Sequence, residues 1–426
     1  MSSVVIPPAY IVSTELVKIS SLLPSNKKRS LLVHSLIKSL GFLHPHGPLD
    51  LVRPQPASLK ELAQYHDRDY LNYIFSNDFR QISEDGQWGL QDDCPVFPGL
   101  PEYVSAIAGA TLTAVKCLQQ STHNTAICWD GGRFSSPRYL TRISRYKPPG
   151  RHHARKSRAS GFCYVADCVL ALMTLRRPTV PSSPTTSPIH RPRVMYLDLD
   201  LHFSDGVSEA FHAPIRSNPP RVLTLSIHHT APGFFPISRL SGLIPPDDDL
   251  FDPFTLSIPL NEGASNRTYA QIWPIVERVR DTFDPDYVVV QCGCDGLARD
   301  PCLKFNWSLG GGDGSMGWCV QRIVHEWTRK KLLLGGGGYN SPNAARAWAY
   351  LTSIAAGCPL DLDASIPDHD GFPLYAPSFT LDVAAGMMQD KNSDEYLGTI
   401  AEHYDYVISV MNDRLSHPVL NVGCSQ

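Results

Sequence analysis

Several features that mark membrane or secreted proteins are missing from this 426-residue sequence. It has no apolar run long enough to span a bilayer and no secretory signal segment after Met1. Its 11 cysteines have no regular spacing, which argues against a disulfide framework. We therefore expect a protein of a reducing intracellular compartment that lies outside the membrane.

The charges of the two signs are also nearly balanced, since 38 Lys and Arg stand against 41 Asp and Glu and the formal net charge is only −3. A protein that binds nucleic acid directly usually carries a basic surface, so none is predicted here. The four glycines at 335–338 lack the Gly-Lys-Ser/Thr ending of a phosphate loop, and no Gly-x-Gly-x-x-Gly motif stands at a strand–helix junction. The sequence thus argues against nucleotide binding.

What the sequence does contain is a series of short apolar runs, each ending in Gly, His, Asp or Tyr. The five runs are "TAICWDGG", "VMYLDLDLH", "VLTLSIHH", "YVVVQCGCD" and "KLLLGGGGY". Helix-like segments lie between them, at 102–118, 162–177, 268–283 and 315–331. This alternation predicts an α/β fold with a single doubly wound, mainly parallel sheet flanked by helices. A further amphipathic helix is expected at 26–40, with Leu31, Leu32, Leu36, Ile37 and Leu40 on one side and Gly41 as its stop.

Polar residues gather where two of these runs end. Asp198, Asp200 and His202 alternate at the end of one strand, and Asp295 ends another. A strand end capped by local hydrogen bonds would explain the first three, but a metal site explains all four. Asp200, His202 and Asp295 would leave one coordination position open, as in catalytic zinc sites, although oxygen-rich ligation also admits iron(II).

Two further groups fit hydrolysis of an amide. His152 and His153 are either exposed loop residues or, with Asp198 and Asp205 behind them, the acid–base pairs of a metal site. Tyr339 follows the four glycines. Because glycine has no side chain, the backbone of this segment could approach the metal closely and bring the Tyr339 hydroxyl to the carbonyl of the amide substrate.

In order, the motifs "DLDLH", "SGFCY", "PGFFP", "CGCDG", "GGGGYN" and "IPDH" resemble those of the class I zinc-dependent histone deacetylases, most closely the short single-domain members. The resemblance runs from about Lys27 to near Ile408. It implies one arginase/deacetylase-like domain over residues 1–426, which hydrolyses acetyl-lysine side chains to lysine and acetate.

The resemblance also assigns roles to residues. It implies metal ligation by Asp200, His202 and Asp295, and general base and acid chemistry by His153 backed by Asp205. His152 with Asp198 matches the neighbouring charge-tuning pair, and Tyr339 the carbonyl-polarising tyrosine. A structural potassium ion would lie near Asp198, Asp200, His202 and Ser226.

The substrate tunnel follows from the same resemblance. Gly161, Phe162 and Phe235 match its apolar walls, and Asp93 matches the rim aspartate that binds the substrate backbone. Cys302 stands at a rim position where Leu or Met is common, which should widen the mouth slightly. Arg29 resembles the basic residue that lines an internal cavity below the metal.

Besides Cys302, the chain departs from the family at three places. Phe203 and Ser204 replace a His-Gly pair, and a positive φ at Ser204 would cost about 1–2 kcal/mol. An insertion at 133–150 separates Gly132 from the paired histidines. Its removal restores "WDGGRHHARKS", the result expected if the segment were a retained intron. A second insertion, at about 176–193, is rich in Pro, Ser and Thr and reads as a disordered surface loop.

Three alternatives stay open at this point. The fold also suits an acetylpolyamine or other small-amide hydrolase, and the first insertion suits a catalytically impaired acyl-lysine-binding scaffold. An arginase-type dimetal hydrolase would need more bridging carboxylates than are seen. The family implies acetylated histone tails or other acetylated proteins as partners, together with a corepressor complex. It also implies a chromatin regulator that represses transcription and is located in the nucleus, with a second pool in the cytoplasm.

Overall fold

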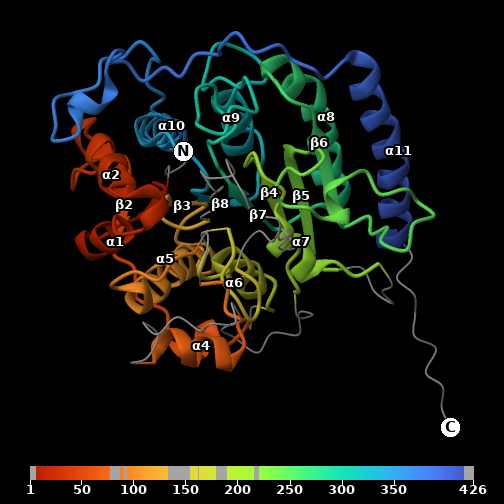
Figure 1. Cartoon of the computed structure of the whole chain (residues 1–426), viewed down its shortest axis with the longest axis horizontal. Helices are drawn as coiled ribbons and strands as arrows, with labels where there is room; N and C mark the ends of the chain where they lie inside the picture. Colours follow the sequence, from red (N-terminus) through yellow and green to blue (C-terminus); the bar gives the residue numbers. More distant parts are fainter. Residues whose placement is uncertain are drawn as a thin grey trace, which may run out of the picture.

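A parallel sheet of eight strands forms the centre of the computed structural model of the chain (Figure 1). The structure describes residues 6–76, 87–90, 94–132, 154–161, 163–178, 190–214 and 220–416. The strands are β1 (Ala9–Ile11), β2 (Asp50–Val52), β3 (Thr125–Cys128), β4 (Val194–Asp198), β5 (Val222–His229), β6 (Thr255–Leu260), β7 (Tyr287–Gln291) and β8 (Lys330–Leu334).

Helices cover both faces of the sheet. They are α1 (Thr14–Ser20), α2 (Arg29–Ser39), α3 (Leu59–Leu62), α4 (Arg68–Phe75), α5 (Leu100–Gln119), α6 (Asp167–Leu175), α7 (Asp205–Phe211), α8 (Asn266–Phe283), α9 (Met316–His325), α10 (Ser341–Ala355) and α11 (Asp394–Ser416). Figure 1 shows α4, α5 and α6 on one side of the sheet and α8, α9 and α10 on the other. Among the described residues, none of the helices combines the length and apolarity that crossing a bilayer requires.

Two hydrophobic cores lie on opposite faces of the sheet, because successive side chains of a strand point to opposite faces. Met195 and Leu197 of β4 pack in the core that contains α8–α10. Val194 and Tyr196 of the same strand pack in the core that contains α5 and α6. Burial on both faces explains why the strands appear as nearly continuous apolar runs, as the sequence predicted for a parallel sheet.

The order of the strands places three chain segments beside one another. The order is β2-β1-β3-β8-β7-β4-β5-β6, and every pairing is parallel. The chain therefore leaves the sheet from β4, β7 and β8 at the same edge, on adjacent strands. Ligand sites of doubly wound sheets form at such carboxyl ends.

The fold class is confirmed, whereas several details of the sequence prediction are wrong. Strands β1, β2 and β6 and helix α10 were not predicted, and the segment 315–331 contains a shorter helix followed by the start of β8. Helix α2 begins at Arg29 after a left-handed Lys28, and Leu31 is 48% exposed rather than buried. The buried side of α2 instead includes Arg29 and His34, which bind polar partners at the centre of the protein.

Candidate functional site

The site begins where β4 ends at Asp198. Beyond the strand, each acidic side chain accepts a backbone N–H from two residues further on. Asp198 Oδ1 lies 2.9 Å from the nitrogen of Asp200, and Asp200 Oδ1 lies 3.1 Å from the nitrogen of His202. These local hydrogen bonds, rather than an alternating strand face, set the direction of each side chain. The hydrogen bonds predicted for a capped strand end are therefore present, and the metal site stays a prediction.

Asp200, His202 and Asp295 are brought together by adjacent strands. His202 Nδ1 lies 3.2 Å from Asp200 Oδ1 and 2.9 Å from Asp295 Oδ2. The exposed fractions are 0% for Asp200 and His202 and 1% for Asp295. Three side chains that sequence analysis assigned to a metal thus face one another in a buried position.

Donors from β7 and β8 hold the second oxygen of Asp200. The side-chain amide of Gln291, the last residue of β7, donates to Asp200 Oδ2 at 2.9 Å. The backbone N–H of Gly337 donates to the same oxygen at 2.8 Å. These two hydrogen bonds leave Asp200 Oδ1 facing His202, which orients the carboxylate.

The run of glycines after β8 allows its backbone to reach the two carboxylates. A Cβ atom on Gly337 would lie 2.3 Å from Asp295 Oδ2 and 2.8 Å from Asp200 Oδ2, closer than real contacts allow. Gly338 has φ +133°, which side-chain-bearing residues rarely adopt. The buried Arg29 donates from Nη1 to the carbonyl of Gly338 at 2.9 Å and lies over the Trp348 ring. Arg29 thus fixes the glycine segment from below.

Tyr339 is anchored through its backbone by a carboxylate that sequence analysis did not single out. The buried Asp300 accepts the N–H of Tyr339 at 2.7 Å and that of Asn340 at 3.3 Å on Oδ2. Its other oxygen accepts the N–H of Cys302 at 3.0 Å. Asp300 therefore joins the loop after β7 to the loop after β8.

Burial and like charge shift the acid–base behaviour of this cluster. Burial, and then the charge of Asp200, raise the pKa of Asp295 to about 7 and also raise that of Asp198. Burial alone would lower the pKa of His202, but its hydrogen bonds to Asp200 and Asp295 outweigh this and raise the pKa to about 9. The cluster therefore favours a bound positive charge, whether a proton or a metal ion.

The His202 ring packs against an aromatic side chain. Phe234 stacks on it with ring centroids 5.2 Å apart and an interplanar angle of 8°. The sequence analysis named the neighbouring Phe235, which is half-buried, and missed Phe234. Gly161, another predicted tunnel wall, is buried with φ +56°. Phe234 thus orients the imidazole, whereas the roles of Phe235 and Gly161 stay predictions.

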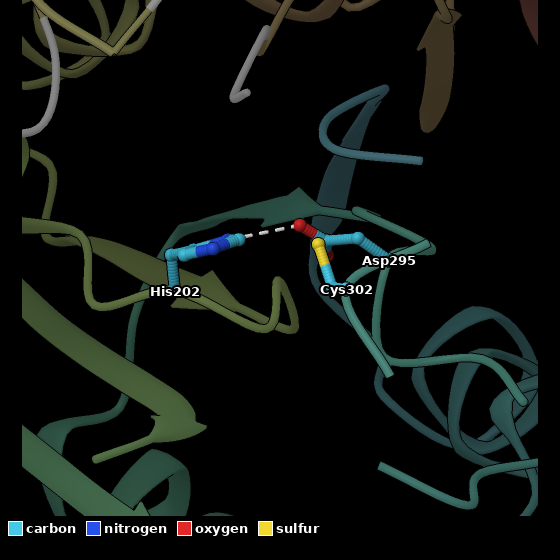
Figure 2. A group of neighbouring side chains, drawn as sticks. All are labelled: His202, Asp295 and Cys302. Carbon is cyan, nitrogen blue, oxygen red and sulfur yellow. Dashed lines mark hydrogen bonds and ion pairs between the residues drawn. The ribbon is translucent and has the colours of Figure 1, made fainter. Parts of the chain in front are cut away.

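Cys302, predicted to stand at the rim of the substrate tunnel, lies beside two of the predicted metal ligands. Ligand atoms of His202, Asp295 and Cys302 all lie within 4.8 Å of one another. Figure 2 shows the sulfur beside the carboxylate of Asp295, with both facing the His202 ring. The side chain therefore belongs to the cluster, and its place at the tunnel mouth stays a prediction.

The two aspartates predicted to support histidines have other partners among the described residues. Asp198 Oδ2 accepts the Tyr196 hydroxyl at 2.6 Å. Asp205 Oδ2 lies 3.5 Å from Nη2 of Arg155, which also binds Glu209 at 2.7 Å. Four predicted residues lie outside the described residues: His152, His153, Asp93 and Phe162. Their pairings and contacts stay predictions.

The expected strain at Ser204 is not present. Its φ is −78°, so the backbone is outside the left-handed region. Its backbone N–H points at Ser226 Oγ at 3.4 Å, and its hydroxyl lies 3.1 Å from that of Ser208. The adjacent Phe203 is buried, with its ring centroid 4.9 Å from that of His228. Serine fits this position at no backbone cost.

The site residues that were not predicted differ in how clearly the sequence pattern marks them. Gln291 ends an apolar strand just as Asp198 does, so its position carried the same signal. Asp300 stands in an irregular loop, where no periodic pattern marks a buried carboxylate. Phe234 and Phe235 are adjacent and chemically identical, and only the path of the chain decides which one faces His202.

Comparison with known proteins gives a consistent result. A model of the histone deacetylase domain matches residues 23–355. The chain is 34% identical over 415 residues to "Histone deacetylase 8" of Xenopus tropicalis, covering 94% of this chain and 98% of that protein. It is 33% identical over 426 residues to "Histone deacetylase 8" of Danio rerio, covering 96% and 95%. It is also 33% identical over 389 residues to "Histone deacetylase 2" of Oryza sativa subsp. japonica, covering 88% and 66%.

Replacement of Gly337 tests the close approach of the glycine segment. If these carboxylates bind a metal, we expect Gly337→Ala to lower the affinity of the cluster for added zinc by roughly 10- to 100-fold, because the added methyl group must displace the carboxylates of Asp200 and Asp295. Competition with a coloured chelator measures this affinity. Gly398→Ala is the control, since a Cβ there meets no atom within 4 Å. Equal zinc affinity in the two variants would contradict the expectation.

Proposed function

Because the chain belongs to the histone deacetylase family and hydrolyses acetyl-lysine, we propose that Asp200, His202 and Asp295 hold the metal ion for this reaction. The observation that carries the proposal is the convergence of two buried carboxylates on one imidazole nitrogen, at 3.2 and 2.9 Å. The three residues extend from β4 and β7, which are adjacent strands of the sheet.

The donor set fits a divalent metal ion. Burying a carboxylate costs several kcal/mol unless an opposite charge compensates for it, and two are buried beside His202. Three protein ligands leave a coordination position for a reactant. We propose zinc as the ion, with iron(II) as the alternative that oxygen-rich ligation admits. Such an ion supplies Lewis-acid polarisation of the acetyl carbonyl and lowers the pKa of the attacking water.

Proton transfer is assigned to the paired histidines. We propose His153, backed by Asp205, as the general base and acid, and His152 with Asp198 as the pair that tunes the local charge. The contact of Arg155 with Asp205 supports this pairing, since Arg155 stands two positions after His153 in the sequence. Arg155 would also hold the Asp205 carboxylate in place.

The hydroxyl of Tyr339 is proposed to donate a hydrogen bond to the oxyanion that develops on the acetyl carbonyl. The support for this role is the attachment of its backbone to Asp300 and the position of the preceding Gly337 against Asp200. A tyrosine held by both segments would need little rearrangement when the carbonyl arrives.

Substrate recognition is proposed from the same family pattern. Gly161, Phe162 and Phe235 would form the apolar walls around the lysine stem, and Asp93 would accept N–H groups of the peptide backbone. Arg29 would line an internal cavity below the centre. The buried Ser226, paired with Asp198 in the sheet register, would belong with Asp198, Asp200 and His202 to a structural potassium site.

The biological setting is a proposal that rests on the relatives. We propose that the substrates are acetylated histones or other acetylated proteins, and that the protein is a nuclear regulator that represses transcription within a corepressor complex. The comparisons do not favour a small-amide hydrolase or an inactive acyl-lysine-binding scaffold. A substrate panel with an acetyl-lysine peptide and an acetylpolyamine would separate the two enzyme classes.

Loss of any one of the three ligands tests the proposed centre. We expect Asp200→Ala, His202→Ala and Asp295→Ala each to reduce bound metal and abolish activity, because the ligands that remain do not hold zinc in a catalytic geometry. Atomic emission measures the metal, and hydrolysis of an acetyl-lysine peptide measures activity. His123→Ala is the matched control, since this buried histidine pairs with Asp50 instead. Full metal content in any of the three variants would refute its ligand role.

Removal of one hydroxyl group tests Tyr339. Tyr339→Phe should retain fold and metal and lower turnover by roughly 10²- to 10³-fold, the usual effect of losing one oxyanion donor. Tyr404→Phe removes another buried hydroxyl, which donates to the carbonyl of Ser257. The control should keep its turnover. If Tyr339→Phe does so too, Tyr339 takes no part in the reaction.

We also propose that residues 1–426 form one deacetylase domain, with insertions at 133–150 and about 176–193. Residues 133–153 and 179–189 lie outside the described residues. A form lacking residues 133–150 should be more active than the full chain. The paired histidines follow this segment directly, and a misplacement of 1 Å costs about 10²-fold in rate. Both forms should be compared on one peptide at equal zinc content; equal turnover would show that the insertion is neutral.

A further inference from the structure

The loop between β7 and α9 holds Cys302 in a defined position. Asp300 accepts the N–H of Cys302 at 3.0 Å and, through its other oxygen, that of Tyr339 at 2.7 Å. The backbone N–H of Leu303 also donates to the carbonyl of Asp300 at 3.0 Å. The backbone of Cys302 is therefore fixed to the same buried carboxylate as the proposed catalytic tyrosine.

Backbone strain surrounds this position. Arg299 and Leu303, neither of them glycine, have φ angles of 67° and 49°. Such conformations are unfavourable for residues with a side chain and persist where neighbouring contacts impose them, often at functional sites. The two strained residues flank the segment that Asp300 holds by hydrogen bonds, and Cys302 lies in this segment.

The sulfur of Cys302 lies close to two of the proposed metal ligands. It and the ligand atoms of His202 and Asp295 all lie within 4.8 Å of one another. Figure 2 shows the three side chains pointing toward one another. Two ligand atoms bound to one tetrahedral zinc, at about 2.1 and 2.3 Å, lie roughly 3.5 Å apart. A shared metal ion therefore requires the sulfur and the other two ligand atoms to move closer together when it binds.

We propose that Cys302 is a fourth protein ligand, whose thiolate binds the metal ion together with Asp200, His202 and Asp295 when no acyl-lysine occupies the site. The inference rests on the proposed function, because it requires that metal centre. On binding, the S–H bond breaks, an S–metal bond forms and the proton passes to solvent, so no oxidant or reductant is required.

This ligation has two consequences. A soft thiolate favours zinc over magnesium and other hard cations, so Cys302 would bias the choice of metal. Four protein ligands close a zinc site, whereas catalysis needs an open position, so the substrate carbonyl or water must displace the thiolate. Cys302 would therefore tighten zinc retention at the expense of turnover.

Cobalt(II) in place of zinc gives a direct readout. The full-length protein, stripped of metal and reloaded with cobalt, should show the intense near-ultraviolet absorption of a thiolate–cobalt bond, and Cys302→Leu should lack it. Cys294→Ala and Cys358→Ser are the controls: Cys294 is buried next to the ligand Asp295, and Cys358 is exposed. Both control variants should retain the absorption.

Proton release gives a second, independent readout. Calorimetry in buffers of different ionisation enthalpy should show that zinc binding releases one proton more from the wild-type protein than from Cys302→Leu. The variant should also bind zinc at least roughly tenfold more weakly. Stoichiometric cobalt binding by the wild-type protein without the thiolate absorption would overturn the role of Cys302 and leave the proposed function intact. Failure of the wild-type protein to bind any metal would overturn both.

Discussion

Burial of several carboxylates beside one imidazole is the constraint on which the rest of the site depends. Asp198, Asp200 and Asp295 are 0–1% exposed, so water cannot stabilise their charges. The protein supplies donors instead, from Tyr196, Gln291 and backbone N–H groups of the segments that leave β4 and β8. These donors can reach the carboxylates only if β4, β7 and β8 end side by side. The parallel sheet aligns their carboxyl ends, because Asp198, Gln291 and Leu334 are partners in its register.

The loops after β7 and β8 are as constrained as the strands that they follow. Gly337 approaches the carboxylates so closely that any Cβ would collide with them, and Arg29 binds the carbonyl of Gly338 from the opposite side. Asp300 then connects this segment to Cys302. A shift of either loop would change the placement of Tyr339 and of the Asp200 and Asp295 carboxylates together, so these segments depend on one another.

The sequence predicts the fold class and the central cluster because both depend on local patterns. Asp200, His202 and Asp295 are visible as polar residues directly after apolar strands, and parallel strands bring such residues together. The side of α2 was mispredicted at Leu31, because burial of Arg29 and His34 depends on partners far away in the sequence. Ser204 was expected to be strained, yet its φ is negative. The family pattern does not fix the backbone angle at a substituted position.

The buried oxygens at the centre favour positive charge, which either a proton or a metal ion can supply. Burial and the charge of Asp200 raise the pKa of Asp295 to about 7. Burial lowers the pKa of His202, but its hydrogen bonds to Asp200 and Asp295 outweigh this effect and raise the pKa to about 9. If the proposed metal ion binds here, it would supply that charge, and its binding would release the proton that the cluster otherwise retains. His202 would then present Nδ1 as a neutral ligand. Its stacking on Phe234 already holds the ring with Nδ1 toward the two carboxylates, so the proposed exchange of a proton for a metal ion would require little movement of the side chains.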